Sequence, residues 1–130
     1  GALEFWKVAI KPGKPLAFGH VENTPFIGLP GNPASVFTTF MILARPFLMA
    51  CQGCHSVEVP QLKAPARFAR EAEKRQVYLR GRLSQQAVEI YPNQSSGVLS
   101  SACWGDVFVV QKSGESIQEG DLVDVLPYAL

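Results

Sequence analysis

The sequence predicts a short α/β segment followed by a small all-β, barrel-like domain. Residues 1–56 hold short apolar strands, a turn rich in glycine and proline, and one long, strongly apolar helical pattern. Residues 57–130 instead hold short strand candidates at regular spacing, separated by turn sequences and with almost no helical periodicity. These candidates are residues 66–69, 76–83, 87–90, 107–111 and 122–126, with one helical turn expected around residues 98–102. We therefore expect one domain to end at residue 56 and the next to begin at residue 57.

The composition is that of a globular protein. The 130 residues suit one ordinary domain or two very small ones, and 47% of them are apolar while 18% are charged. No apolar run reaches the roughly 18 residues that a membrane span needs, and the first residues lack the pattern of a signal peptide. Three cysteines fit no secreted disulfide framework. We expect a cytoplasmic protein with reduced thiols and no membrane partner.

Three short strands are expected in the first domain. Residues 5–10 read as the first strand, which the sequence Lys-Pro-Gly-Lys-Pro at 11–15 ends. Because two prolines bracket a glycine, that turn has little conformational freedom. Residues 16–21 form the second strand and residues 26–29 the third, with a turn at 22–25 between them.

The sequence Gly-Leu-Pro-Gly-Asn-Pro at 28–33 leads from the third strand into a helix. Asn32 is a preferred N-cap residue, and Pro33 takes the first helical position, where proline is favoured. Apolar residues then recur at steps of three and four up to residue 48. Pro46 lacks the N–H group that continues a helix, so we expect a kink or an end there. Gly53 is the expected C-cap.

This strand-to-helix turn is a candidate anion site. In open α/β sheets ligands bind at the carboxyl ends of strands. Free backbone N–H groups and the positive end of the helix dipole attract anions there. The glycines would let the backbone approach the ligand, and the prolines would hold the turn rigid. A tight turn with a purely structural role would have the same residues, so the turn by itself leaves both interpretations open.

Three lysines are expected close to this turn. Lys7, Lys11 and Lys14 are spaced four and three residues apart across the end of the first strand and its Pro-Gly turn. Ammonium groups gathered beside a helix N-terminus would bind phosphate or a similar oxyanion. Solvated surface lysines are the alternative interpretation.

Charge is distributed unevenly in the second domain. Residues 63–82 carry seven basic and two acidic side chains, whereas residues 83–130 carry six acidic side chains and one lysine. This asymmetry predicts either an anion-binding face or pairing of the two stretches across a sheet. Only Phe68 and Tyr78 in the basic stretch have rings that could stack on bases, so we expect no nucleic-acid partner.

The sequence Cys-Gln-Gly-Cys-His at 51–55 matches the short pattern that attaches c-type haem. Haem attachment needs an exported chain and a second axial ligand, and neither is evident. Zinc would need a fourth ligand beside Cys51, Cys54 and His55. We favour the simpler interpretation, a helix that ends at Gly53 with small thiols packed below it, and we expect no metal ligands here.

Several motifs together resemble one family. They are FWKVAIKPGKPLAFG at 5–19, GLPGNPAS at 28–35, RGRL at 80–83, NQSSGVLSSACWGDVFVV at 93–110 and IQEGDLVDVLPY at 117–128. In this order they resemble the molybdopterin molybdenumtransferase family, of the MoeA and gephyrin E-domain type. The resemblance covers the whole chain. It implies that residues 1–56 are the end of a molybdopterin-binding α/β domain and residues 57–130 a β-barrel-like C-terminal domain.

The resemblance also implies a function. Members of the family insert molybdate into adenylylated molybdopterin and release AMP, with a divalent cation such as Mg²⁺. It implies a homodimer, with a molybdopterin adenylyltransferase as a further partner. Transferred residue by residue, it implies catalytic roles for Lys7 and Lys11, and molybdate binding by Arg75 and Ser96. The substrate-binding residues that it implies are Lys14, Pro30, Asn32, Pro33 and Ser35.

Two other functions stay open from the sequence. One is a protein-interaction or dimer-supporting module without catalysis. The other is a generic phosphate-binding α/β protein, which would bind simple nucleotides with no preference for oxymetallates. Because the chain would be the last third of a family member, we expect it to be inactive alone.

Overall fold

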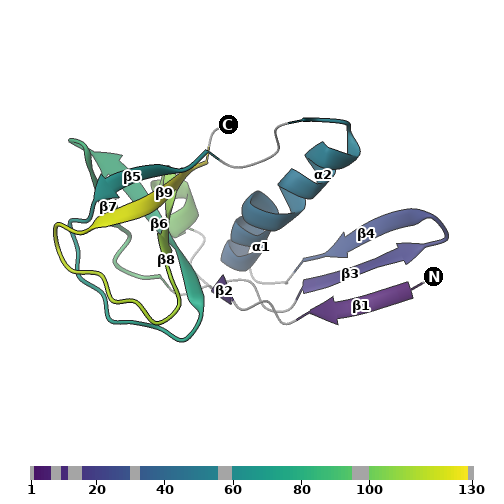
Figure 1. Cartoon of the computed structure of the whole chain (residues 1–130), viewed down its shortest axis with the longest axis horizontal. Helices are drawn as coiled ribbons and strands as arrows, with labels where there is room; N and C mark the ends of the chain where they lie inside the picture. The colour runs from purple at the N-terminus through teal and green to yellow at the C-terminus, as the bar shows by residue number, and fades with distance from the viewer. Residues whose placement is uncertain are drawn as a thin grey trace.

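The computed structural model of the chain describes residues 2–6, 10–11, 16–29, 33–55, 60–94 and 100–128. It shows two parts (Figure 1): a three-stranded sheet with a long helical segment, followed by a curled antiparallel sheet. This arrangement confirms the expected class, an α/β segment followed by a small all-β unit that resembles a barrel. Among the described residues, none of the helices has the length and hydropathy needed to cross a membrane.

The first sheet is antiparallel and has the strand order β1-β3-β4. β1 (Ala2–Trp6) pairs with β3 (Leu16–Val21), which pairs in turn with β4 (Thr24–Gly28). The two residues between β3 and β4 form the hairpin turn, in which Glu22 has a φ of 56°. β3 has the bounds that the sequence predicts.

The strand expected at residues 5–10 contains parts of two strands of the structure, and residues 7–9 lie outside the described residues. β1 already begins at Ala2, and β2 (Ile10–Lys11) pairs with a strand of the second sheet. A local pattern of apolar residues indicates extended backbone but does not specify which sheet provides the partner.

The helical segment that follows the first sheet has three pieces. They are α1 (Pro33–Thr39), the π-helix η1 (Phe40–Ala44) and α2 (Arg45–Cys51). In η1 the Arg45 N–H donates to the Phe40 carbonyl, five residues earlier. The distortion expected at Pro46 therefore takes the form of a π-helical turn just before it, and the helix continues to Cys51.

The end of α2 lies where the sequence predicts it. Gly53 has a φ of 85°, a conformation that suits glycine after a helix. The Cys54 N–H donates to the Met49 carbonyl at 3.1 Å, which satisfies one of the last carbonyls of the helix. The Phe47 ring meets Phe18 of β3 edge to face, with 5.5 Å between centroids. The helical segment thus packs on the first sheet.

The second sheet curls into a half-barrel. β6 (Gln76–Ser84) lies between β7 (Ala87–Ile90) and β8 (Val107–Gln111). Next to β8 comes β9 (Leu122–Pro127), and next to β9 comes β5 (Leu62–Pro65). An isolated bridge between Ala66 and Val88 spans the gap between β5 and β7.

Strands β7 and β8 have the bounds that the sequence predicts. The strand expected at 66–69 is wrong, because the extended segment is β5, which ends at Pro65 and pairs with β9. The helical turn expected around residues 98–102 is α3 (Ser100–Trp104).

Two apolar clusters lie on opposite faces of the curled sheet. The cluster enclosed by the curl is built by alternate strand residues that are at most 2% exposed, among them Val77, Leu79, Val107, Val109 and Val125. The other cluster contains Tyr78, Phe108 and Leu126, and residues of the helical segment pack against it.

One side chain of α1 dominates this second contact. The Phe37 ring lies 5.6 Å from the Phe108 ring and 5.0 Å from the Tyr128 ring, measured between centroids. The helical segment therefore packs between the first sheet and the outer face of the half-barrel, and joins the two parts.

Candidate functional site

The structure describes four of the nine site residues that the sequence predicts. They are Ser35 and Arg75, together with the backbone of Lys11 and Pro33. The other five lie outside the described residues, so their roles stay predictions: Lys7, Lys14, Pro30, Asn32 and Ser96.

The pairing of β2 with β6 in the second sheet brings the backbones of two predicted site residues into one part of the molecule. β2 runs parallel to the start of β6, with Ile10 opposite Gln76 and Lys11 opposite Val77. Neighbouring strands lie about 4.8 Å apart. Arg75 directly precedes β6 and is two residues before Val77, the partner of Lys11. The two cationic residues thus come from distant parts of the sequence to the same end of one strand pair.

Backbone contacts hold the segment that leads to Arg75. The Gly114 N–H donates to the Glu73 carbonyl at 2.8 Å. The Ser113 hydroxyl donates to the Lys74 carbonyl at 2.5 Å. The two residues before Arg75 are therefore both bonded to the turn that follows β8.

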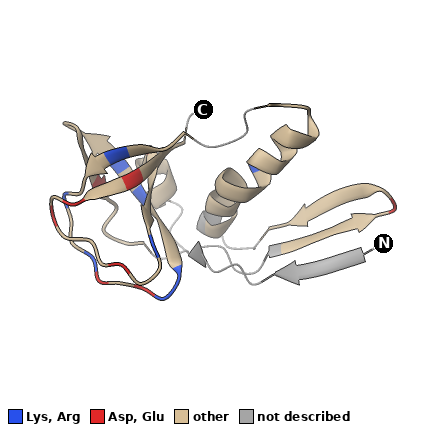
Figure 2. Ribbon diagram, in the orientation of Figure 1, with Lys and Arg blue, Asp and Glu red and all other residues tan. Residues whose placement is uncertain are grey.

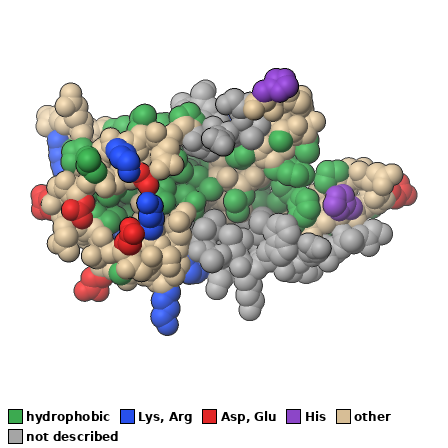
Figure 3. Space-filling model, in the orientation of Figure 1, with side chains coloured by type: hydrophobic (Ala, Val, Ile, Leu, Met, Phe, Trp, Pro, Cys, Tyr) green, Lys and Arg blue, Asp and Glu red, His purple; other side chains and the backbone are tan. Residues whose placement is uncertain are grey.

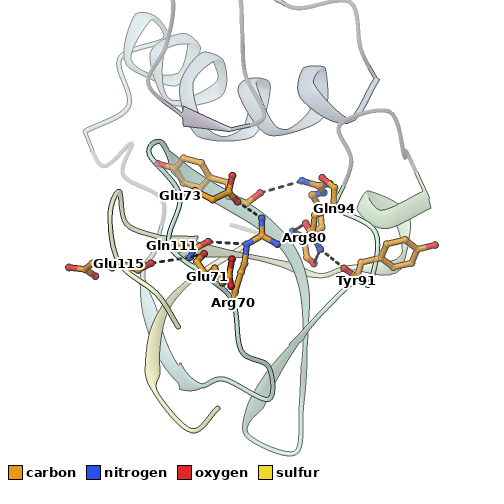
Figure 4. A network of polar contacts seen from close by, with 9 residues as sticks. Arg70, Glu71, Glu73, Arg80, Tyr91, Gln94, Gln111 and Glu115 are labelled. Atoms are coloured by element: carbon orange, nitrogen blue, oxygen red, sulfur yellow. Dashed lines mark hydrogen bonds and ion pairs between the residues drawn. The ribbon is translucent and has the colours of Figure 1, made fainter. Parts of the chain in front are cut away.

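The side chain of Gln111 ties the same segment to β8 (Figure 4). Its Oε1 accepts a hydrogen bond from Arg70 Nε at 3.0 Å, and its Nε2 donates to the carbonyls of Glu71 at 2.8 Å and Glu115 at 3.0 Å. Arg70 also forms an ion pair with Glu73. Gln111 is only 1% exposed, and this network satisfies its buried amide.

A second network surrounds Arg80, a buried cation in the middle of β6. Its Nε donates to Ser101 Oγ at 3.0 Å, and its Nη2 donates to the Gln94 carbonyl at 2.7 Å. Burial lowers the pKa of Arg80, and Tyr128 opposes this shift. Because the ordinary pKa of arginine is far above neutrality, the side chain keeps its charge.

Ser35 belongs to a buried polar stripe on α1. It is 4% exposed, while Thr38 and Thr39 are fully buried. Residues three and four apart share one face of a helix, so these hydroxyls lie together. The Thr39 hydroxyl is buried without a hydrogen-bond partner among the described residues. Ser35 therefore lies on the inner side of α1 and not on its open surface.

The basic stretch of the second domain is partly neutralised. Lys63 pairs with Asp124 at 2.7 Å, and Arg67 pairs with Glu89 at 3.2 Å. These pairs join the basic and acidic stretches across the half-barrel, as one of the two sequence interpretations predicted. Figures 2 and 3 show both signs of charge interspersed over the half-barrel.

The Cys-Gln-Gly-Cys-His segment lies on the surface. Cys51, Cys54 and His55 are all exposed. The described part of the chain contains no group of three histidine, cysteine or acidic side chains placed to hold a metal ion. The thiols are thus not packed below the helix end, which corrects our expectation.

No pattern in the sequence marks the residues of the two networks as functional. Arg80, Gln94 and Ser101 lie in two motifs that resemble the family, but a motif does not reveal which of its side chains bond to one another. Gln111 ends a strand and gives no signal of its own in the sequence.

Comparison with protein families finds two matches along the chain. Residues 61–128 match the model described as the MoeA C-terminal region (domain IV), and residues 1–50 match a probable molybdopterin binding domain.

Three curated relatives are similar in sequence. A molybdopterin molybdenumtransferase of Haemophilus influenzae is 35% identical over 141 aligned positions, which cover 98% of this chain and 34% of the relative. One from Synechococcus elongatus is 35% identical, over 85% of this chain and 28% of its own length. The molybdenum cofactor synthesis protein cinnamon of Drosophila melanogaster is 34% identical, over 79% of this chain and 18% of its own length. The chain thus spans about a third or less of the length of these relatives.

Solved structures show the same fold. A molybdopterin biosynthesis MoeA protein from Pyrococcus horikoshii superposes with a TM-score of 0.78 at 29% identity, over 94% of this chain and 31% of that one. A molybdenum cofactor biosynthesis protein from Pyrococcus furiosus superposes with a TM-score of 0.83 at 22% identity. The superposition covers 97% of this chain and 45% of that one. The family models, the relatives and the fold agree: the chain belongs to the MoeA family of molybdopterin molybdenumtransferases.

Proposed function

We propose that the natural protein containing this chain inserts molybdate into adenylylated molybdopterin and releases AMP. Family membership supports the reaction class. The observation that supports the site is the parallel pairing of β2 with β6, in which Lys11 lies opposite Val77, two residues after Arg75. Both substrates are anionic, so a site where cationic residues from two parts meet suits them.

In this proposal each part of the molecule holds one side of the substrates. Lys7, Lys11 and Lys14 neutralise the pterin phosphate and the molybdate oxygens, and the 28–33 turn binds the phosphate through its backbone N–H groups. Pro30, Asn32 and Pro33 shape that turn, and Ser35 follows it. Arg75 and Ser96 hold molybdate from the half-barrel. Bringing the two substrates together in the right orientation supplies most of the catalysis.

The family also implies a divalent cation such as Mg²⁺. Magnesium in phosphate-transfer sites is bound largely by substrate phosphates and water, with one or two carboxylates. The described residues contain no cluster of three potential metal ligands. We therefore place the cation with the substrate phosphates and assign no step to it.

The proposal extends to partners and location through the family resemblance. The natural protein would be a cytoplasmic homodimer that receives its substrate from a molybdopterin adenylyltransferase. The interspersed charges of the half-barrel do not favour nucleic acid as a partner.

Calorimetric titration of the natural protein with molybdate tests the proposal. Lys11→Ala and Ser96→Ala should each weaken binding by about tenfold, since each removes a charged or hydrogen-bonding contact to the oxyanion. Lys112→Ala is the matched control, because this lysine is exposed and lies on the half-barrel. An interaction module would bind molybdate equally in all variants. A generic phosphate-binding protein would bind simple nucleotides with no preference for molybdate.

A further inference from the structure

Cys51 and Cys54 are separated by two residues, and the proposed function uses neither of them. We propose that these two thiols form a reversible disulfide across the turn that ends α2, which makes this turn an oxidation-sensitive site of the protein. The inference does not depend on molybdate binding, because it concerns the end of the helical segment that lies away from β2 (Figure 1).

Burial does not explain the two cysteines. Cysteine is among the residue types most often buried, where it packs as a small apolar side chain. Cys51 and Cys54 are instead both exposed, and so is His55, which follows them. Both thiols are free in this structure. They are therefore open to oxidants and reductants in the solvent.

The turn between the two cysteines returns the chain to the end of the helix. The Gly53 N–H donates to the Ala50 carbonyl at 3.0 Å, and the Cys54 N–H donates to the Met49 carbonyl at 3.1 Å. This is the Schellman arrangement, which glycine permits with its φ of 85°. Because Met49 belongs to the last turn of α2, the backbone of Cys54 is held beside the turn that carries Cys51.

This turn can adjust to the geometry of a disulfide. Bridged cysteines have Cα atoms about 4.4–6.8 Å apart. Three residues of fully extended chain span at most about 11 Å, and the hydrogen-bonded turn shortens that span. A Cβ atom at Gly53 would meet no atom of the described residues within 4 Å, so no packed neighbour there opposes a small movement of the turn.

A metal site is the alternative use of the same thiols, and their surroundings do not favour it. A structural zinc site needs four ligands. Within the described ranges, no third histidine, cysteine or acidic side chain is placed with the two thiols to hold an ion. A disulfide needs only two sulfur atoms, so oxidation suits the pair as it stands.

The oxidant in this proposal is a peroxide. One thiolate attacks a peroxide oxygen, so that an S–O bond forms while the O–O bond breaks, and the departing oxygen takes up a proton. The second thiol then attacks the same sulfur: an S–S bond forms, the S–O bond breaks and water leaves. With hydrogen peroxide, the two thiols lose two electrons in total and the peroxide is reduced to two waters. Small thiols such as glutathione reverse the reaction by thiol–disulfide exchange.

Peptide mapping of the natural protein tests the inference. Trypsin cuts after lysine and arginine but not before proline, so Cys51 and Cys54 share the peptide 8–63, while Cys103 lies in the peptide 83–112. After treatment with hydrogen peroxide and alkylation of the remaining thiols, peptide 8–63 should be unalkylated and lighter than its reduced form by two hydrogen atoms. Dithiothreitol should restore two thiols that can be alkylated.

The exposed Cys103 is the matched control, because it has no cysteine three residues away. It should form no disulfide with peptide 8–63. Two outcomes would overturn the proposal: peptide 8–63 that carries only sulfenic or sulfinic acids, or a disulfide that joins either of its cysteines to Cys103 or to a second copy of the chain.

Hydrogen–deuterium exchange gives a second readout. Oxidation should slow exchange of the Gly53 and Cys54 amides, whose hydrogen bonds close the turn, by about threefold or more. Cys51→Ser should abolish this response to peroxide, and Cys103→Ser should keep it. Both substitutions replace exposed thiols, so the fold should be unaffected. A response that survives in Cys51→Ser, or exchange that peroxide leaves unchanged in the unaltered protein, would contradict a disulfide across the turn.

Discussion

Ile10 lies opposite Gln76 in a parallel strand pair, which adds a short strand from the first part of the chain to the curled sheet. The residue after Ile10 is Lys11, and the residue before Gln76 is Arg75. The backbone contact between the parts therefore coincides with the position where cationic residues from both are proposed to meet. The packing of α1 on the half-barrel supports this contact.

Phe37→Ala should weaken the packing between the two parts. Truncating a fully buried phenylalanine to alanine lowers the free energy of unfolding by about 3–5 kcal/mol. Phe37 is half-buried and contacts the rings of Phe108 and Tyr128, so we expect a loss of about 2 kcal/mol. Denaturant titration measures it. Leu48→Ala, at a side chain that is 47% exposed, is the control and should cost less; equal losses would contradict the prediction.

Gln111→Leu should destabilise the half-barrel through unpaired polar groups. The substitution keeps the size of the side chain but leaves Arg70 Nε and the carbonyls of Glu71 and Glu115 without this partner. Each buried polar group left unpaired lowers the free energy of unfolding by about 1–3 kcal/mol. Denaturant titration should therefore show that Gln111→Leu lowers the free energy of unfolding by at least about 2 kcal/mol. Gln118→Leu, at an exposed position, should have little effect. A stable Gln111→Leu protein would show that the network contributes nothing.

Asp124 should contribute to the loss of stability in acid. The hydrogen bond from Lys63 is the main cause that holds the pKa of Asp124 below its ordinary value, although burial opposes it. A carboxylate with a lower pKa in the folded state stabilises the protein above the ordinary aspartate pKa of about 4. This contribution is lost as the pH falls through the folded value.

Asp124→Asn should therefore reduce the fall in melting temperature below about pH 4. The change is expected to be small, because the Lys63 side chain is 64% exposed and solvent screens the pair. Melting curves across the acid range measure it, with the exposed Glu119→Gln as control. Identical curves for Asp124→Asn and the unaltered protein would contradict the assignment.

Gly105→Ala should be costly because α3 approaches β6 closely at this residue. A Cβ atom at Gly105 would lie 2.7 Å from the Gly81 carbonyl oxygen and 2.8 Å from the Tyr128 hydroxyl. Overpacking of this kind costs about 1–3 kcal/mol. Gly114→Ala is a useful comparison: its φ of 76° is unfavourable for alanine, but no atom lies within 4 Å of the new Cβ. Thermal melting should show a larger fall in melting temperature for Gly105→Ala than for Gly114→Ala. The reverse order would refute the close contact.

Local sequence predicted those elements whose bounds depend on local chemistry. β3, β7 and β8 have the expected bounds because alternating or apolar runs lie between turn residues. The helix begins at Pro33, because proline has a fixed φ that suits the first helical turn. It is capped at Gly53, because glycine adopts a positive φ without strain. The strand expected at 66–69 was wrong because the extent of a strand depends on its partner, and the partner of β5 is β9, which is distant in the sequence.

By itself the sequence determined the family, the division into an α/β part and a half-barrel, and the types of residue proposed to bind an oxyanion. These properties reside in short motifs. Only the tertiary structure decided that Lys11 pairs two residues away from Arg75, that Ser35 lies on the buried side of α1, and that Arg80 bonds to Gln94 and Ser101. Such contacts depend on pairing between segments tens of residues apart and on which face of each segment becomes buried, and neither is encoded in any one stretch of the chain.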